Sequence, residues 1–545
     1  MQAVSPRLRA VESGAETAIA AQNDDRPSIT LTGQGLAIGQ AVRIASGSAH
    51  LALSAPVAAA IAAGHERLAR AVAEQRQIYG ITTGFGPLAN RFIPPAHADA
   101  LQQGLINHLA TGVGPNFGWA EARMILLCRL LSVARGHSGA SPELVALLLA
   151  VLASPFAPRI PQMGTVGASG DLTPLSHLAL ALMGRGAFID RAGNRVENGA
   201  VFAQIAHPPF RPVARDALAI VNGTSAMTGI AALNHIATAR LLGWLTALGL
   251  GYAEVLGARA EAWHPAFAAV RPHPGQIRQA EALRARAAGS ARLVTAPVAE
   301  HRLEIGAEVR EHSTALQDAY TLRCIPQLLG AAEDVLAFHG TVVTREMHAA
   351  TDNPIFPESG PPALHGGNFM GQHVAYAADA LSNAVIGAAQ LAERQVARIT
   401  DERLNDGLPP FLQRGTPGLN SGLMGAQVTA TALLAEMRSQ AVPASIQSIS
   451  TNGANQDVVS MGTIAARNCA RHIENANRIA AILALAVAQA VEIRRDQDRH
   501  DGFSPATAAL VAAIRTRSAP LAEDRPLSSD IEDIAALIAQ TDAPA

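Results

Sequence analysis

The sequence of 545 residues contains no lysine, so all 42 of its Lys and Arg residues are arginine. Pyridoxal enzymes hold their cofactor (PLP) as a Schiff base on a lysine, and this chemistry is therefore excluded. A phosphate-binding loop that depends on lysine and a lysine general base are excluded as well. If the protein acts on amines or amino acids, its electrophile must come from another source.

Cysteine is also scarce. Cys128, Cys324 and Cys469 lie far apart and form no C-x-x-C pair. A disulfide framework is therefore not expected, which fits a reducing compartment. The first residues lack the charged-then-apolar pattern of a signal sequence, so we expect the protein to be cytoplasmic.

Aromatic residues make up 4% of the chain, and the formal net charge is -2. A chain without a basic surplus has no electrostatic footprint for nucleic acid. Its apolar runs, such as residues 144–153 and 479–488, are shorter than the ~18–20 residues that span a bilayer. We expect neither nucleic acid nor membrane as a partner.

The remaining composition favours helix, because alanine is abundant and β-branched runs are few. We predict a loose tail over residues 1–27 and then a small β element, from short alternating patches at 28–32 and 41–44. Helical patterns cover residues 144–153, 217–250, 425–438 and 463–494. Ser141 and Pro142 provide a cap and a first helical position for the earliest of them. The prediction is a mostly α fold that contains a bundle of long helices.

The most informative segment is residues 164–177, with the sequence GTVGASGDLTPLSH. Gly170 has no side chain, so its amide nitrogen can approach the carbonyl carbon of Ala168. Ring closure there, with dehydration of Ser169, gives an imidazolone with an exocyclic methylidene, which is a strong electrophile. The competing interpretation is a glycine-rich turn before a helix, with Thr173 as its cap and Pro174 in the first position.

Further segments carry polar groups, and each has a structural alternative. Tyr79 begins the glycine-rich loop YGITTGFG, which lacks the G-x-G-x-x-G pattern of a nucleotide site. Asn222 can cap a helix, Arg323 can be a solvated charge, and Asn353 precedes proline as in an ordinary turn. The planar fork of an arginine such as Arg323 also suits a carboxylate.

Amides and histidines complete the set of candidates. Asn452, Asn455 and Gln456 lie close together, and we expect these amides to be buried and to position other groups through hydrogen bonds. His365 lies in a glycine-rich segment that we expect to pack under the site. Neither His177 nor His365 has the spacing of a metal site, so no metal is expected.

In chain order, six of these segments resemble those of the histidine, phenylalanine and tyrosine ammonia-lyase family. The resemblance implies 4-methylidene-imidazol-5-one (MIO), formed from Ala168-Ser169-Gly170, as the cofactor. It implies the long-helix bundle of the aromatic amino acid lyases, which is of the fumarase/aspartase-like type. The expected parts are an N-terminal MIO-containing domain over 28–215, a central bundle over 216–500, and a C-terminal helical segment over 501–545. Family members are homotetramers whose sites combine several subunits, and a homotetramer is expected here.

The resemblance also implies roles for single residues. Tyr79 resembles the base that removes a β-proton from the substrate, and Tyr320 resembles a second tyrosine near the leaving amine. Asn222 is expected beside the MIO. The remaining expected contacts of the substrate or cofactor are Gln317, Arg323 and Asn353, with Arg323 and Asn353 on the carboxylate, and the amides Asn452 and Gln456.

The substrate is expected from two positions. His108-Leu109 occupies the family's selectivity pair, where phenylalanine-specific members have Phe-Leu and histidine lyases have Ser-His. A histidine can bond a para-hydroxyl group, although His108 can also be a core residue packing on a helix. Gln456 stands where histidine lyases carry a glutamate. The prediction is deamination of tyrosine to p-coumarate and ammonia, with phenylalanine as a slower substrate.

Other functions stay open at this point. A phenylalanine or histidine ammonia-lyase fits His108 and Gln456 less well. A tyrosine 2,3-aminomutase shares the MIO, and the sequence separates it poorly from a lyase. An inactive structural assembly of long helices is disfavoured because Ala168-Ser169-Gly170 and both tyrosines are intact.

Overall fold

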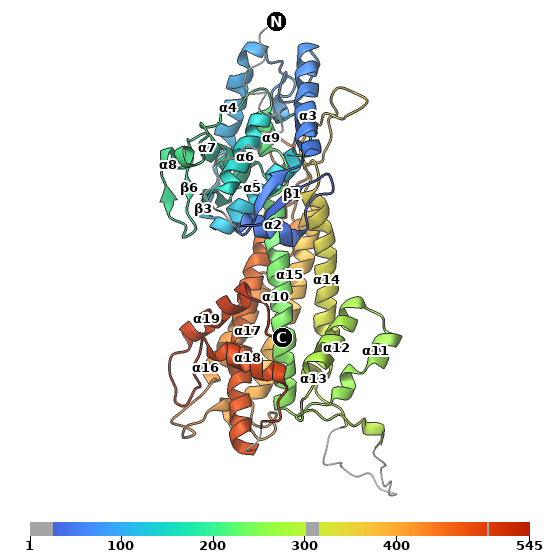
Figure 1. Ribbon diagram of the computed structural model, residues 1–545, viewed down its shortest axis with the longest axis vertical. Coiled ribbons are helices and arrows are strands. Elements are labelled where there is room, and N and C mark those ends of the chain that lie inside the picture. The colour runs from blue at the N-terminus through green and yellow to red at the C-terminus, as the bar shows by residue number, and fades with distance from the viewer. Residues whose placement is uncertain (1–25, 301–315, 499–500) are drawn as a thin grey trace.

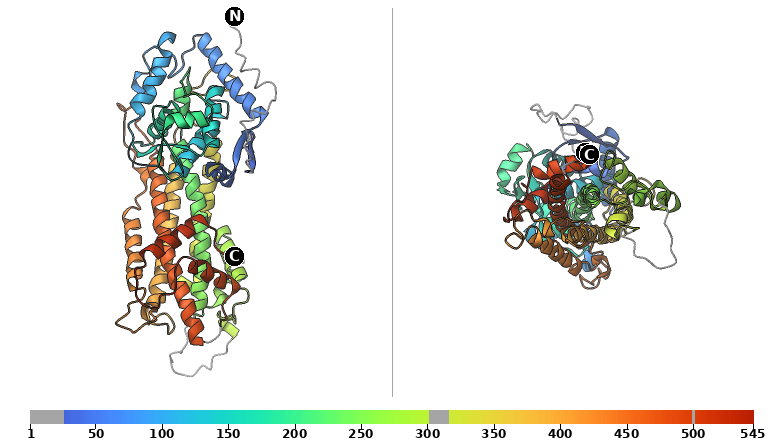
Figure 2. Two further views of the ribbon diagram at one scale, coloured as in Figure 1. Left: turned by 60° about the vertical axis from the view of Figure 1, so that its left-hand side comes forward. Right: turned by 90° about the horizontal axis from the view of Figure 1, so that it is seen from below.

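Four long helices form the axis of the protein. The computed structural model describes residues 26–300, 316–498 and 501–545. The long helices are α10 (Ser225–Val255), α14 (Ile325–Met347), α15 (Gln372–Thr400) and α17 (Gly462–Asp498). Helix α17 packs against α10 and α15, and α14 packs against α15. The N-terminal elements cover one end of this bundle (Figure 1, Figure 2). The predicted mostly α fold is confirmed, whereas residues 1–25 of the predicted tail lie outside the described residues.

The N-terminal part surrounds the upper end of the bundle in Figure 1. Its strands form small sheets, in which β1 (Ser28–Leu31) pairs with β2 (His50–Leu53), β3 (Val113–Asn116) with β5 (Pro161–Met163), and β6 (Phe188–Ile189) with both β4 (Ala157–Pro158) and β7 (Arg195–Val196). Its helices are α2 (Ile38–Ala45), α3 (Ala55–Ala73), α4 (Ala98–Leu109), α5 (Trp119–Val133), α6 (Pro142–Ala153), α7 (Leu172–Leu182), α8 (Asn198–Gln204) and α9 (Asp216–Val221).

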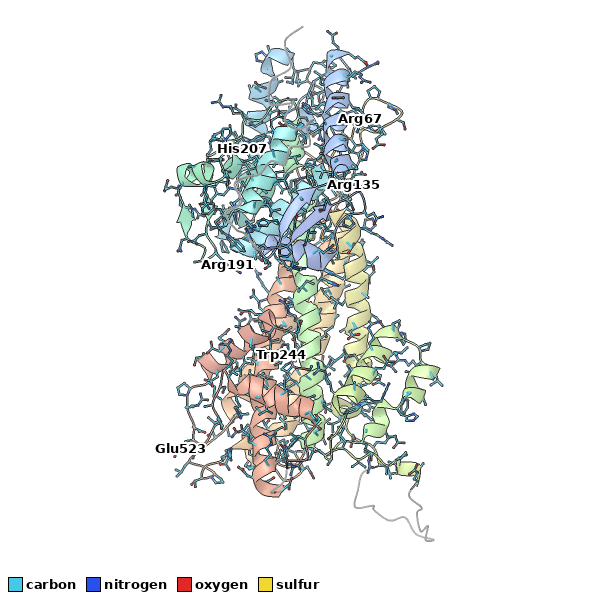
Figure 3. The ribbon with its side chains drawn as sticks, viewed as in Figure 1. Arg67, Arg135, Arg191, His207, Trp244 and Glu523 are labelled. Atoms are coloured by element: carbon cyan, nitrogen blue, oxygen red, sulfur yellow. The ribbon has the colours of Figure 1, made fainter. Side chains whose placement is uncertain are left out.

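Shorter helices flank the bundle further down. They are α11 (Pro265–Val270), α12 (Pro274–Arg286), α13 (Tyr320–Arg323), α16 (Met424–Ser439), α18 (Pro505–Arg515) and α19 (Ser528–Gln540). Trp244 on α10 lies in the middle of the bundle (Figure 3), and its indole Nε1 donates to the carbonyl of Thr541 at 2.9 Å. The C-terminal segment is thereby tied to the bundle.

Two large hydrophobic cores follow one another along α10. Met227 and Ile230, near its start, belong to the core of the N-terminal elements. Leu241 and Leu248 belong to the core of the bundle. The C-terminal helices α18 and α19 share that second core. The domain boundaries expected from the sequence stay predictions, but the cores locate the change between the two parts within α10.

The predicted helices agree with the structure except at two points. Ser141 caps α6 as predicted, since its side chain accepts a hydrogen bond from the Leu144 amide at 3.2 Å. The prediction that residues 41–44 belong to a β element is wrong, because these residues lie in α2. Four of its residues are buried at helical spacing, Ile38, Ala41, Ile44 and Ala45. A four-residue window is too short to separate the two periods.

The second difference is a break in the helical pattern over 217–250. The structure divides it into α9 and α10, with Asn222, Gly223 and Thr224 between them. Gly223 has a φ of +147, and its carbonyl accepts a hydrogen bond from the Asp171 amide at 2.7 Å. The break therefore results from packing against residue 171. That contact cannot be seen in the sequence around residues 222–224.

Helix α17 contains a long, strongly apolar stretch. By length and composition, an 18-residue window in it could cross a membrane, with a mean hydropathy of 1.5. However, 89% of that window is buried inside the protein, and no other helix in the described ranges passes the same test. Burial between α10 and α15 accounts for its apolar character.

Two histidines stack inside the bundle. The ring of His339 on α14 lies parallel to that of His235 on α10, with centroids 5.8 Å apart. His339 is fully buried, and among the described residues neither of its ring nitrogens has a hydrogen-bond partner. Burial, together with His235, lowers the pKa of His339 to about 3. The His339 ring is therefore neutral in the folded protein.

Replacing His339 with leucine should make the fold more tolerant of acid. Because the folded pKa lies below the unfolded value of about 6.5, stability is lost as the pH falls through 6.5 toward the folded value. At pH 5 this single group costs the wild type about 2 kcal/mol. We expect the thermal unfolding midpoint of His339→Leu to fall less than that of the wild type between about pH 7 and pH 5. An equal fall in both proteins contradicts this assignment.

Candidate active site

A large cavity lies where the N-terminal elements meet the bundle. Its volume is about 1210 Å³. Its walls come from the loop that begins at Tyr79, helix α4, the turn at Ala168 and Ser169, and the segment 452–458. Of the residues predicted for the site, the cavity is lined by Tyr79, His108, Leu109, Ala168, Ser169, Asn222, Asn353, Asn452 and Gln456. The structure thus brings most of the predicted site together.

The segment Ala168-Ser169-Gly170 forms a tight turn at the cavity wall. Ser169 and Gly170 have φ values of 52 and 77, both in the left-handed region, and Gly167 has a φ of 80. A Cβ at position 170 would lie 2.2 Å from the carbonyl oxygen of Gly223, so only glycine fits there. Because Ser169 is not a glycine, its left-handed φ is a strained backbone conformation. The residues present therefore fit the cyclised group that the sequence predicts.

Asp171 anchors this turn to the N-terminal ends of two long helices. Its carboxylate accepts hydrogen bonds from the Met227 amide of α10 at 2.8 Å and from the Thr463 hydroxyl of α17. Complete burial raises the pKa of Asp171 to about 6, and the hydrogen bonds from Thr463 and Met227 oppose this rise. The N-termini of α7, α10 and α17 thus meet at the turn, where their partial positive charge favours an anion. A glycine-rich turn does precede a helix here, as the competing interpretation expected, but α7 begins at Leu172, so Thr173 is not its cap and Pro174 is not its first residue.

Asn222 connects the turn to Asn353. Its Nδ2 donates to the Ser169 carbonyl at 3.0 Å, and its Oδ1 accepts from the Asn353 amide at 2.7 Å. The side chain of Asn353 accepts in turn from the Gly366 amide at 2.7 Å. The alternative role of Asn222 as a cap of α10 is wrong, since Thr224 occupies that position.

Tyr79 is held by its own loop. Its phenolic oxygen accepts a hydrogen bond from the Gly86 amide at 2.8 Å, and its ring meets Phe85 edge to face. Its amide donates to Nε2 of His365 at 3.1 Å, so the glycine-rich segment at 365 supports the loop. Gln102, which the sequence analysis missed, is buried and donates to the Gly80 carbonyl at 2.9 Å. The only sequence feature that could have indicated this role is the position of Gln102 on the buried face of α4.

His108 lies at the last turn of α4, with Leu109 beside it. Its Nδ1 lies 2.9 Å from the Gly104 carbonyl, which can only accept, so Nδ1 is the donor. In the neutral ring Nε2 is then left as an acceptor. His108 is exposed and lines the cavity, which does not fit a core histidine.

The amides at 452–456 form another part of the cavity wall. Gln456 Nε2 lies 3.2 Å from the Ser169 hydroxyl, and Gln456 also bonds Thr451. Asn452 and Asn455 are exposed, so the expectation that these amides are buried is wrong for them. They belong to a tight turn in which Asn452 has a φ of 53.

Three predicted residues lie elsewhere. Tyr320 and Arg323 are the ends of α13, which directly precedes α14, and Gln317 lies just before α13. Asn353 follows the other end of α14. A helix of 23 residues is roughly 35 Å long. Arg323 Nη1 donates to Gln317 Oε1 at 2.5 Å, its guanidinium lies 4.7 Å from the centroid of the Tyr320 ring, and Tyr320 is 68% exposed. One chain therefore does not bring these three residues to Ser169.

Fold and site together define a helix-bundle enzyme with its reactive groups at the N-terminal ends of long helices. The model of the aromatic amino acid lyase family matches residues 36–516. The chain belongs to this family, whose members depend on MIO, and the family predicted from the motifs is confirmed.

Individual relatives cover nearly the whole chain. A tyrosine ammonia-lyase of Cereibacter sphaeroides is 53% identical over 95% of this chain and 99% of its own length. A tyrosine ammonia-lyase of Cupriavidus metallidurans is 41% identical, covering 91% of this chain and 93% of the relative. The crystal structure of tyrosine aminomutase from Streptomyces globisporus superposes with a TM-score of 0.88 at 37% identity, covering 94% and 97% of the two chains.

Proposed function

We propose that this protein deaminates L-tyrosine to trans-p-coumarate and ammonia, and that phenylalanine is a slower substrate. The observation that carries the proposal is the placement of His108 in the same cavity as Ser169 and Tyr79. Its free ring nitrogen can accept the hydrogen bond of a phenolic hydroxyl group. A site built for that bond discriminates against a substrate that lacks the hydroxyl.

The MIO is proposed to form from the turn itself. The Gly170 nitrogen would bond to the Ala168 carbonyl carbon, and the oxygen of that carbonyl would leave as water with the amide hydrogens of Gly170 and Ser169, so that a C=N bond forms between Ala168 and Ser169. Ser169 then loses its hydroxyl and its α-proton as a second water. Asn222 and Gln456, which already contact the Ser169 carbonyl and hydroxyl, would hold the product. Once formed, the MIO supplies the electrophile that accepts the substrate amine.

Tyr79 is proposed to take a proton from the β-carbon of the substrate. The Gly86 amide, which can only donate, points at its phenolic oxygen and stabilises that oxygen when it carries negative charge. The contact of its ring with Phe85 fixes the direction of the oxygen. Asn353 is proposed to hold the carboxylate, so that the amine and the β-carbon face their partners.

A homotetramer is proposed to complete this site. Tyr320 and Arg323 lie far from Ser169 in one chain, so a second copy must supply them if they act on the same substrate. Large apolar side chains are exposed on the bundle, among them Leu328, Phe338, Val428 and Ile446. These side chains are available for apolar contacts between copies of the chain. The three cysteines are free, which supports the proposed cytoplasmic location.

Steady-state assays with tyrosine, phenylalanine and histidine test the substrate. We expect tyrosine to have the highest kcat/KM, phenylalanine a lower value, and histidine no measurable turnover. The products p-coumarate, cinnamate and urocanate have distinguishable absorbance spectra. Preference for histidine or phenylalanine would overturn the proposal.

An aminomutase is the second candidate, because a 41% identical relative is named MIO-dependent tyrosine 2,3-aminomutase. This activity returns ammonia to the β-carbon, so its product is β-tyrosine. Chromatography of the products separates β-tyrosine from p-coumarate. We expect p-coumarate and equimolar ammonia as the products.

Replacing His108 with phenylalanine should shift the preference toward phenylalanine. The variant loses the acceptor for the para-hydroxyl group and gains apolar area. We expect kcat/KM for tyrosine relative to phenylalanine to fall by about 10- to 100-fold. Paired measurements on both substrates check this, and an unchanged ratio contradicts the role of His108.

A further inference from the structure

Helix α5 buries two arginines in an otherwise apolar segment. Arg123 is 1% exposed and Arg129 is 0% exposed. In the described part of the chain neither guanidinium forms an ion pair with a carboxylate, unlike buried Arg215, which pairs with Asp352. A buried cation without a counter-ion needs strong hydrogen-bond acceptors. Arg129 donates to a carbonyl and a hydroxyl next to the site, whereas Arg123 donates only to carbonyls away from it.

Arg129 bonds the segment behind the reactive turn. Its Nη1 donates to the Asn222 carbonyl at 2.7 Å, and its Nη2 donates to the Ser132 hydroxyl at 2.7 Å. Ser132 accepts in turn from the Thr351 amide at 3.1 Å. One guanidinium thus ties α5 to the break between α9 and α10 and to the segment that leads to Asn353.

Arg129, Gly223 and Gly170 pack so closely that neither glycine has room for a side chain. A Cβ at Gly223 would lie 2.2 Å from Arg129 Nη1, and a Cβ at Gly170 would lie 2.2 Å from the Gly223 carbonyl oxygen. The guanidinium, Gly223 and Gly170 are therefore stacked in contact. The turn cannot relax away from the cavity while Arg129 stays in place.

The charge of Arg129 strengthens this support. Burial lowers the pKa of Arg129 to about 10, so the group still carries its charge at neutral pH. Asp352 and Asp171 raise that pKa, whereas Arg215 lowers it. A charge-assisted bond to a carbonyl is stronger than a neutral one. A neutral side chain of similar size would hold Asn222 less firmly.

We propose that Arg129 is the positioning residue that fixes Asn222 and Gly223 against the Ala168-Ser169-Gly170 turn, and that ring closure of the turn depends on it. This inference rests on the proposed function, in which the turn loses two waters. Arg129 has no contact with the cavity and acts only through Asn222 and Gly223.

Arg123 provides a matched control on the same helix. It donates only to backbone carbonyls away from the site, those of Ala45, Leu152, Ser154 and Phe156. Arg123→Met and Arg129→Met both remove a buried guanidinium without breaking an ion pair. Arg123→Met breaks four hydrogen bonds and a contact with the Trp119 ring, and Arg129→Met breaks two hydrogen bonds. The control therefore loses more contacts, whereas only Arg129→Met should affect the turn.

The test is the mass of the peptide that spans residues 164–177 in full-length wild type, Arg129→Met and Arg123→Met, together with each protein's thermal unfolding midpoint. We expect the fraction lacking two waters to fall by about tenfold or more in Arg129→Met and to stay at the wild-type level in Arg123→Met. Equal processing in both variants overturns the inference. A wild-type peptide that has lost no water overturns the proposed function instead.

If Arg129→Met does not fold, the lysine pair Arg129→Lys and Arg123→Lys decides. Lysine keeps the charge but loses the planar fork that reaches Asn222 and Ser132 together. We expect processing to be reduced in Arg129→Lys and complete in Arg123→Lys. Complete processing in both contradicts the positioning role.

Discussion

Ser169→Ala should abolish the deamination of tyrosine and leave the helical fold intact. The variant removes the hydroxyl whose loss creates the exocyclic methylidene, so no electrophile can form. The chain has no lysine that could provide another one. We expect a rate below about one thousandth of the wild-type value. Product absorbance measures the rate, and circular dichroism measures the helix content.

A matched serine controls for local disturbance. Ser176, on α7, is buried and donates to the Thr173 carbonyl at 2.7 Å without lining the cavity. Ser176→Ala should retain activity, because it removes a hydroxyl from the same segment but not from the turn. Undiminished turnover by Ser169→Ala would remove the basis for a self-made electrophile.

Tyr79→Phe is expected to have the second largest effect. The substitution keeps the ring against Phe85 but removes the oxygen that the Gly86 amide contacts. A positioned acid or base contributes about 10²- to 10⁴-fold, and we expect kcat to fall by that range with a small change in KM. Initial rates over a range of tyrosine concentrations separate the two constants.

Tyr376→Phe is the comparison for this variant. Tyr376 lies on α15, is 55% exposed, and does not line the cavity. Its hydroxyl should therefore be dispensable for turnover. If Tyr79→Phe and Tyr376→Phe have the same kcat, the base is another group.

Local chemistry made part of the site predictable from the sequence. A turn that must close on itself needs glycine, and Gly170 meets the Gly223 carbonyl so closely that no side chain fits. Tyr79 and His108 lie in segments whose order resembles that of the family, and the structure places both in the cavity with Ser169. These residues could be predicted because short segments specify them.

The remaining features depend on contacts between distant segments. Residues 41–44 alternate over too few positions to separate strand from helix. The break at Asn222–Thr224 arises because Gly223 bonds Asp171, which lies far away in the sequence. Tyr320 and Arg323 fit the family motif, but the sequence alone does not tell whether they belong to the site of their own chain or to the site of a second copy. The only sequence feature that marks Arg129 is its charge inside the apolar stretch MILLCRLLSV. Its hydrogen bond to Asn222 can be found only from the folded structure.

The mass of the peptide spanning residues 164–177 of the purified wild-type protein shows whether the turn forms its own electrophile. We expect this peptide to be lighter than its sequence by two water molecules, and fragmentation to place both losses within Ala168-Ser169-Gly170. An unmodified peptide from protein that deaminates tyrosine would contradict this expectation, because the electrophile would then have another origin.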